Sequence, residues 1–166
     1  RAHDKIGVFY PDIKVTDEIV KSNPHLKGLE NQELKIIASM WARTVKSPNP
    51  AFSEVEVPLI RSYMLSTKAG GEAYLQPVIN EKNEYTFNVI NSAPSDLELV
   101  KQGTKMARGA NFKCLLSGVP ISSNYVKSEA KAGRLGTKLL AIAVESPIGR
   151  TYVSPSYELE MLAESA

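Results

Sequence analysis

Apolar positions follow two different periods along the chain. The strongest helical pattern recurs every three or four residues, at Leu34, Ile37, Ala38 and Trp41. Asn31 is placed to cap it, so we expect a helix over 31–43 with Trp41 in the core. A shorter helix is expected over 16–23, because Thr16 suits an N-cap and Pro24 stops the pattern.

After a Pro-rich loop at 47–50 the pattern changes to that of β-strands. Segments 55–65, 73–79 and 85–89 are typical of an antiparallel meander, with Pro58 marking an edge or a bulge. The later segments predict a short strand at 112–116, a helix over 123–132, a buried strand at 139–144, a strand at 151–153 and a closing helix from Pro155.

These elements predict an α+β fold: a mostly antiparallel sheet with ribbon-like hairpins and a few packed helices. A chain of 166 residues with 43% apolar residues fits one domain with a real core. We therefore expect a single domain over 1–166, with an N-terminal helical segment at about 1–43 and a mixed body at about 44–166. Arg1 opens within a charged stretch, which favours a piece of a larger protein.

The composition limits the cellular compartment in which we expect this protein. No run of 18 apolar residues is present, so we expect no membrane partner. The single cysteine, Cys114, excludes an intramolecular disulfide and favours a reducing cytoplasm. Because Leu115 and Leu116 follow it, we expect Cys114 to be buried and inert.

Charge is distributed unevenly although the net charge is only +2. From Lys101 to Lys138 there are eight basic residues and one acid, Glu129, so this span carries +7 and the remainder −5. Clustered cations of this kind suit nucleic-acid phosphates, whose attraction is independent of sequence. A solvated basic face, or contacts with another protein, would show the same composition.

Two turns, at 47–52 and 114–118, resemble the hairpin tips that hold zinc in a zinc ribbon. Only Cys114 in them is a thiol. One thiolate with serines and a phenylalanine cannot complete a four-ligand zinc site. By chemistry alone, these are two ordinary turns.

Longer strings carry a resemblance to a known family. WARTVKSPNP at 41–50 and VPLIRSYMLS at 57–66 are similar to the inserted region of large adenine-specific DNA methylases that contain a zinc ribbon. So are KSEAKAGRLG at 127–136, LLAI at 139–142 and GRTYVSP at 149–155. The resemblance covers roughly residues 41 to 155, with a weaker echo at 6–11.

The resemblance implies where this chain departs from its relatives. Family members carry cysteines where this chain has Ser47, Phe52 and Ser117, and Cys114 is the one retained. We therefore expect no bound zinc, and a ribbon that persists on hydrophobic contacts with Phe52 filling the space of the metal.

The catalytic motifs of such methylases are missing. Neither the Gly-rich S-adenosylmethionine loop nor the Asp/Asn-Pro-Pro-Tyr motif that grips a flipped adenine is present, and Gly70-Gly71 lacks the GxGxxG pattern. In the family this segment lies between those two motifs. The resemblance thus implies a non-catalytic insert that binds neither a cofactor nor a small-molecule substrate. The parent protein would use S-adenosylmethionine to methylate N6 of adenine. Some relatives belong to restriction-type systems.

The leading hypothesis is that this insert contributes DNA binding or target recognition. Its candidate residues are Lys105, Arg108, Lys113, Lys127, Lys131, Arg134 and Lys138. The alternative is a structural module that docks on the methylase core or a partner protein. Cations on one exposed face favour DNA, and scattered or acid-paired cations favour the module. An independent enzyme is disfavoured, since neither His3 nor His25 has a companion acid or nucleophile at a useful spacing.

Overall fold

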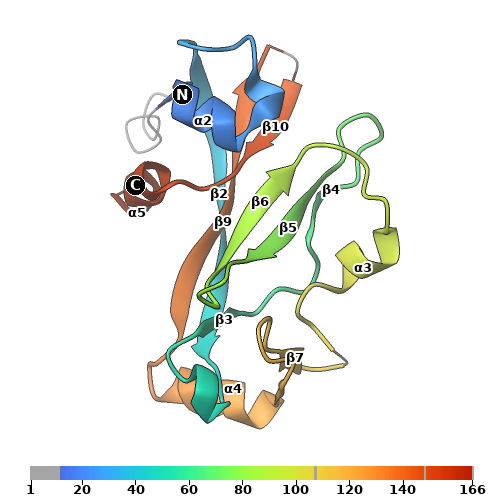
Figure 1. The fold of residues 1–166 in the computed structure, drawn as a ribbon, viewed down its shortest axis with the longest axis vertical. Helices are drawn as coiled ribbons and strands as arrows, with labels where there is room; N and C mark the ends of the chain where they lie inside the picture. Colours follow the sequence, from blue (N-terminus) through green and yellow to red (C-terminus); the bar gives the residue numbers. More distant parts are fainter. Residues whose placement is uncertain (1–11, 107, 148, 166) are drawn as a thin grey trace, which may run out of the picture.

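A long two-stranded ribbon organises the molecule. The computed structural model describes residues 12–106, 108–147 and 149–165. Strands β2 (Glu33–Lys46) and β9 (Gly136–Ser146) pair antiparallel along the length of the molecule (Figure 1). The same sheet gains β10 (Gly149–Val153) beside β9, and β1 (Ile13–Lys14) and β3 (Glu56–Pro58) at opposite ends of β2.

A smaller sheet and several short helices pack around this ribbon. The smaller sheet has the order β4 (Met64–Ser66), β5 (Ala73–Ile79), β6 (Tyr85–Ile90). A two-stranded hairpin is formed by β7 (Phe112–Lys113) and β8 (Pro120–Ile121). The helices are α2 (Asp17–Ser22), η2 (Pro24–Leu26), η3 (Pro50–Phe52), α3 (Leu97–Gln102), α4 (Ser123–Lys131) and α5 (Tyr157–Ser165). The fold is α+β with mostly antiparallel sheet, as predicted.

β9 is apolar on both faces because it separates two cores. Ile142 and Val144 face the cluster beneath α2 and α5, whereas Ala141 and Ala143 face the cluster beneath the smaller sheet. The register skips Leu140, so this bulge turns two successive residues toward the smaller sheet. A continuous apolar run is the expected pattern for a strand buried on both faces.

The helix expected over 31–43 is wrong, because this segment is most of β2. The register skips Ile37 between Ile36 and Ala38, and such a bulge breaks the simple alternation of a strand. The apolar spacing then imitates a helix. Trp41 is not in the core either: its side chain is 36% exposed, and Ile37 is 40% exposed.

Most other local predictions are confirmed. Thr16 caps α2, whose Ile19 N–H donates to the Thr16 hydroxyl at 3.3 Å, and Asn23 ends the helix. Strands β5, β6, β9 and β10 and helices α4 and α5 lie close to where the pattern placed them. The single strand expected over 55–65 is wrong, because this segment forms two strands in different sheets: β3 pairs with β2, and β4 pairs with β5. Ser122, the residue before the start of the helix expected over 123–132, caps α4. The echo at 6–11 and His3 lie outside the described residues.

A third, smaller cluster occupies one end of the ribbon. We call it the distal cluster; its buried members are Val45, Val57, Cys114, Ile121 and Val126. It joins the ends of β2 and β3 to the β7–β8 hairpin and α4, which lie together at the lower end of Figure 1. Among the helices of the described residues, none has the length and apolar character needed to cross a membrane.

Candidate nucleic-acid interface

The two predicted turns both form, and both border the distal cluster. In the first, Ser47 N–H donates to the Val55 carbonyl at 2.9 Å. In the second, Gly118 N–H donates to the Cys114 carbonyl, and Cys114 N–H donates to the Val119 carbonyl, each at 2.9 Å. Gly118 has φ +68, a conformation that glycine adopts without strain.

The turns meet at Cys114. The Ser47 hydroxyl donates to the Cys114 sulfur at 3.7 Å, and Cys114 is only 1% exposed, as expected. Burial by itself raises the pKa of the Cys114 thiol, but hydrogen bonds from Ser117, Leu116 and Ser47 outweigh it and leave the pKa below its ordinary value. Three of the four positions singled out by the resemblance therefore come together.

Phe52 does not fill the centre of this site. It ends η3 with a half-buried side chain, and the described side chains that pack on the distal cluster, such as Val55, Leu116 and Leu135, do not include it. Within the described residues no group of three or more His, Cys, Asp or Glu side chains is placed to hold a metal ion. Serine hydroxyls and aliphatic contacts hold the turns together.

α4 presents two lysines from a fixed platform. The Ser122 hydroxyl accepts from Tyr125 N–H at 3.2 Å, and Val126 anchors the helix in the distal cluster. The Tyr125 hydroxyl donates to the Lys46 carbonyl at 3.1 Å. Lys127 and Lys131 stand on the exposed side of α4, one turn apart.

Arg134 and Lys138 are engaged within the protein. The Arg134 guanidinium donates to both oxygens of Glu129, at 2.8 and 2.6 Å, and this hydrogen bonding lowers the pKa of Glu129. Lys138 lies on β9 with its ammonium 5.1 Å from the centre of the Tyr85 ring. These two cations are less available to a partner than those on α4.

The other candidates lie on a closed loop. Lys105 and Phe112 form an isolated antiparallel bridge, and Lys113 N–H donates to the Thr104 carbonyl at 2.8 Å. Arg108 is exposed near the tip of this loop. These contacts close a hairpin, described over 104–106 and 108–113, that presents cations and that we call the basic hairpin.

Asn111 joins the basic hairpin to α4. Its side-chain amide donates to the Arg108 carbonyl at 2.8 Å, and its side-chain oxygen accepts from Ser123 N–H at 3.0 Å. Arg108, Lys127 and Lys131 thus belong to adjoining elements at one end of the molecule. Among the described ion pairs none involves any of the three.

The sequence did not single out two further cations. Arg61 and Lys101 line a shallow hollow of about 280 Å³ together with Lys105. Lys101 is the first residue of the basic span, so the charge pattern of the sequence could have added it to the candidate residues. Arg61 lies some forty residues earlier, and no local signal connects it with the span.

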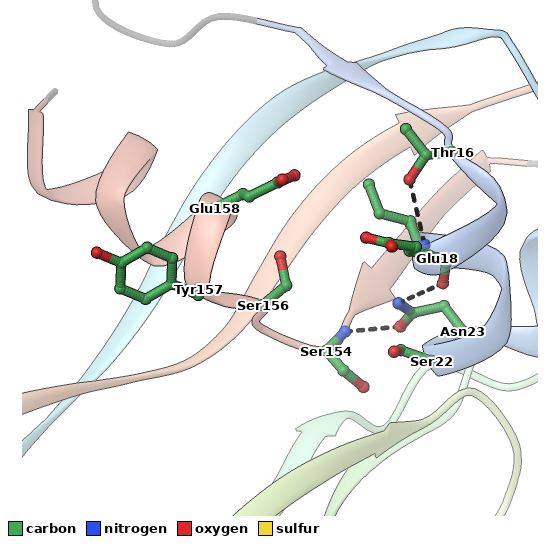
Figure 2. A pocket seen from close by; sticks show the side chains of 9 residues that line it. Thr16, Glu18, Ser22, Asn23, Ser154, Ser156, Tyr157 and Glu158 are labelled. Atoms are coloured by element: carbon green, nitrogen blue, oxygen red, sulfur yellow. Dashed lines mark hydrogen bonds between the residues drawn. The ribbon is translucent and has the colours of Figure 1, made fainter.

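The polar residues that line a cavity between α2 and α5 include Asn23, whose hydrogen bonds hold the fold together. The cavity measures about 320 Å³, and Figure 2 shows Glu18, Ser156 and Glu158 around it. The buried Asn23 at its base donates to the Ile19 carbonyl at 2.9 Å and accepts from Ser154 N–H at 2.7 Å (Figure 2). These hydrogen bonds fasten α2 to the chain that follows β10.

His25 is likewise engaged in the fold. Its ring contacts the Asn91 side-chain nitrogen at 3.2 Å, and burial lowers the pKa of His25. The Asn91 oxygen accepts from the Thr151 hydroxyl and from Tyr152 N–H, so this group joins β6 to β10.

Comparison with models of known families, with curated proteins and with solved structures finds no match to this chain.

Proposed function

We propose that this chain is the non-catalytic insert of a cytoplasmic adenine-specific DNA methylase and contributes contacts to DNA. The family part of the proposal rests on the sequence strings at 41–66, 127–142 and 149–155. The parent enzyme would bring S-adenosylmethionine and the catalytic motifs, and this chain would contribute a surface.

One observation carries the DNA part of the proposal: Asn111 ties the basic hairpin to the start of α4. Exposed cations from two adjoining elements, Arg108, Lys127 and Lys131, therefore lie at one end of the molecule. Phosphate contacts need positioned charge and no base recognition. A few such contacts correspond to non-specific binding, with a dissociation constant on the order of 10 to 100 µM near physiological salt.

Salt dependence of binding tests the proposal. A fluorescein-labelled duplex is titrated with the protein at several salt concentrations, and the anisotropy gives the affinity. We expect the double variant Lys127→Ala/Lys131→Ala to flatten the plot of log affinity against log salt by about 1.8, since each phosphate contact contributes roughly 0.9. Both side chains are exposed, so the fold should be unchanged.

The matched control is Lys21→Ala/Lys27→Ala, which removes two exposed lysines beside α2, at the opposite end of Figure 1 from α4. It should leave the salt slope unchanged. Equal effects of the two double variants would indicate long-range attraction only, and no binding at low salt would reject the DNA contact.

A docking module remains the second candidate because of the exposed apolar side chains on β2. Ile37 and Trp41 lie along a stretch of β2 that neither β1 nor β3 covers. Such a patch suits a protein partner such as the methylase core. Association with the separately expressed core that is insensitive to salt and is lost in Trp41→Ser would favour this function over DNA binding.

A further inference from the structure

Two hollows of different chemistry lie on either side of the C-terminal end of α3. One is the cationic hollow of Arg61, Lys101 and Lys105. The other is a cleft of about 390 Å³ that runs between β5, α3 and the β7–β8 hairpin. Gln102 lines both, so the two hollows adjoin. A ligand with one charged and one flat apolar part could occupy both.

The cleft has apolar walls and polar groups at its margin. Tyr74, Pro77, Leu99 and Leu115 contribute to the walls. Leu99 is 62% exposed, so its side chain is open to a ligand in the cleft. Tyr63 also lines the cleft and is buried, and its burial raises the pKa of its hydroxyl to about 12.

Polar groups in the cleft are placed to contact the edge of a ring. Gln76 of β5 is exposed and makes no side-chain hydrogen bond within the described residues. Asp96 lies at the start of α3, where its carboxylate accepts from Leu99 N–H at 3.0 Å. Lys113 comes from the basic hairpin, which connects the cleft to the proposed DNA surface.

The cationic hollow is built by a close backbone contact. Gly103 has φ +59, and a Cβ there would lie 2.5 Å from the Ile60 carbonyl oxygen, so only glycine lets α3 approach the 60–62 segment. The fully buried Thr104 hydroxyl donates to the Pro58 carbonyl at 2.7 Å and accepts from Ile60 N–H at 2.9 Å. These contacts bring Arg61 beside Lys105.

Charge in the hollow is only partly balanced. The Lys101 ammonium lies 3.0 Å from a Glu98 carboxylate oxygen, in a pair that is open to solvent. Neither Arg61 nor Lys105 forms an ion pair among the described residues. The hollow therefore has cations to offer to an anion.

We propose that the two hollows together bind an unpaired nucleotide of a nucleic-acid strand, with a phosphate at Arg61 and Lys105 and a base in the cleft against Tyr74 and Leu99. Proteins that bind single strands combine a cationic track with aromatic platforms in this way. A paired base cannot enter, because stacking and pairing cover its faces and one edge. The inference rests on the proposed DNA-binding function and adds a preference for unpaired bases.

The test compares three labelled DNAs: a twelve-nucleotide oligothymidine, the same strand with abasic sites at its centre, and a duplex. We expect the intact strand to bind more tightly than the abasic strand, by roughly 5-fold or more for one lost stacking contact. Leu99→Ser and Tyr74→Leu should each remove that advantage while leaving duplex affinity and the salt slope unchanged. Leu99 is exposed, so its variant stays informative if Tyr74→Leu disturbs the fold.

Arg61→Gln/Lys105→Gln should reduce the salt slope for the single strand by about 0.7, the contribution of one phosphate contact on a single strand. Lys21→Gln/Lys27→Gln is the control and should leave the slope unchanged. Equal affinity for intact and abasic strands, or no effect of Leu99→Ser, overturns the inference even if the duplex still binds through α4. Binding of an apolar peptide that oligothymidine cannot displace also overturns it. Loss of all salt-dependent binding overturns the proposed function as well.

Discussion

The two ends of the ribbon are stabilised in different ways. At the α2 end, side-chain amides join segments far apart in the chain: the buried Asn23 links α2 to Ser154, and the partly buried Asn91 links β6 to β10. At the α4 end, a small aliphatic cluster is closed by hydroxyl groups around Cys114, and the lysines of α4 stay exposed. The first end is thus a rigid anchor, whereas the second carries available charge.

The largest effect is expected at the anchor end, from Asn23→Ala. Asn23 is 1% exposed, and its loss leaves the Ile19 carbonyl and Ser154 N–H without their partner. A buried unsatisfied group costs about 1 to 3 kcal/mol, so we expect the free energy of unfolding to fall by about 3 kcal/mol. Urea unfolding measures it, with Asn88→Ala on β6 as a control, because Asn88 is exposed and makes no side-chain hydrogen bond within the described residues. A change below about 1 kcal/mol would show that water replaces these bonds.

Gly103→Ala should come next and tests the close contact between the end of α3 and the 60–62 segment. The new methyl group would meet the Ile60 carbonyl at 2.5 Å in a left-handed conformation. We expect a loss of about 2 kcal/mol in the free energy of unfolding. Gly70→Ala is the matched control, since Gly70 also has positive φ but open space around it. Equal losses in both variants would mean that conformation alone, without the close contact, sets the cost.

What the sequence revealed differs between local and long-range features. α2 was predictable because its cap, Thr16, lies next to the apolar pattern that it starts. α4 was predictable because a pair of serines precedes it, and the first of these, Ser122, is its cap. β2 was mistaken for a helix because the bulge at Ile37 alters its spacing. The strand signal was nonetheless present, since β-branched residues such as Ile36, Thr44 and Val45 favour strands.

The candidate site also has local features that the sequence predicts and long-range features that it does not. Lys127 and Lys131 could be read from one helix, and their exposure matches that expectation. The pairing of Arg134 with Glu129 depends on the chain turning back after α4, and the approach of Arg61 to Lys105 depends on the Gly103 contact. Both are tertiary arrangements that composition and spacing do not encode.

A smaller effect, dependent on pH, is expected at the α4 end from Glu129→Gln. The Arg134 hydrogen bonds lower the pKa of Glu129 below its ordinary value of 4.5, so the folded state favours the carboxylate. Its stabilising contribution is therefore complete above the unfolded pKa and is lost as the pH falls through the folded pKa. Thermal unfolding should show the variant less stable at pH 7 and equal to the wild type at the lowest pH. A difference that persists in acid would point to packing instead of charge.

The smallest expected effect is none at all: we expect zinc to leave the stability of the α4 end unchanged. Four-ligand zinc sites use thiolate or imidazole donors, whereas the residues gathered here are one cysteine and two serines. The Ser47 hydroxyl donates to the Cys114 sulfur, so the arrangement presents a proton where a metal would need a lone pair. Hydroxyl groups also hold their protons at neutral pH, unlike thiols beside a metal. Native mass spectrometry should therefore find the mass of the chain alone, and the unfolding temperature should be the same with added zinc and with a chelator. One zinc ion per chain that survives the chelator would contradict this, and would mean that the two turns keep a metal-binding geometry with donors outside this group.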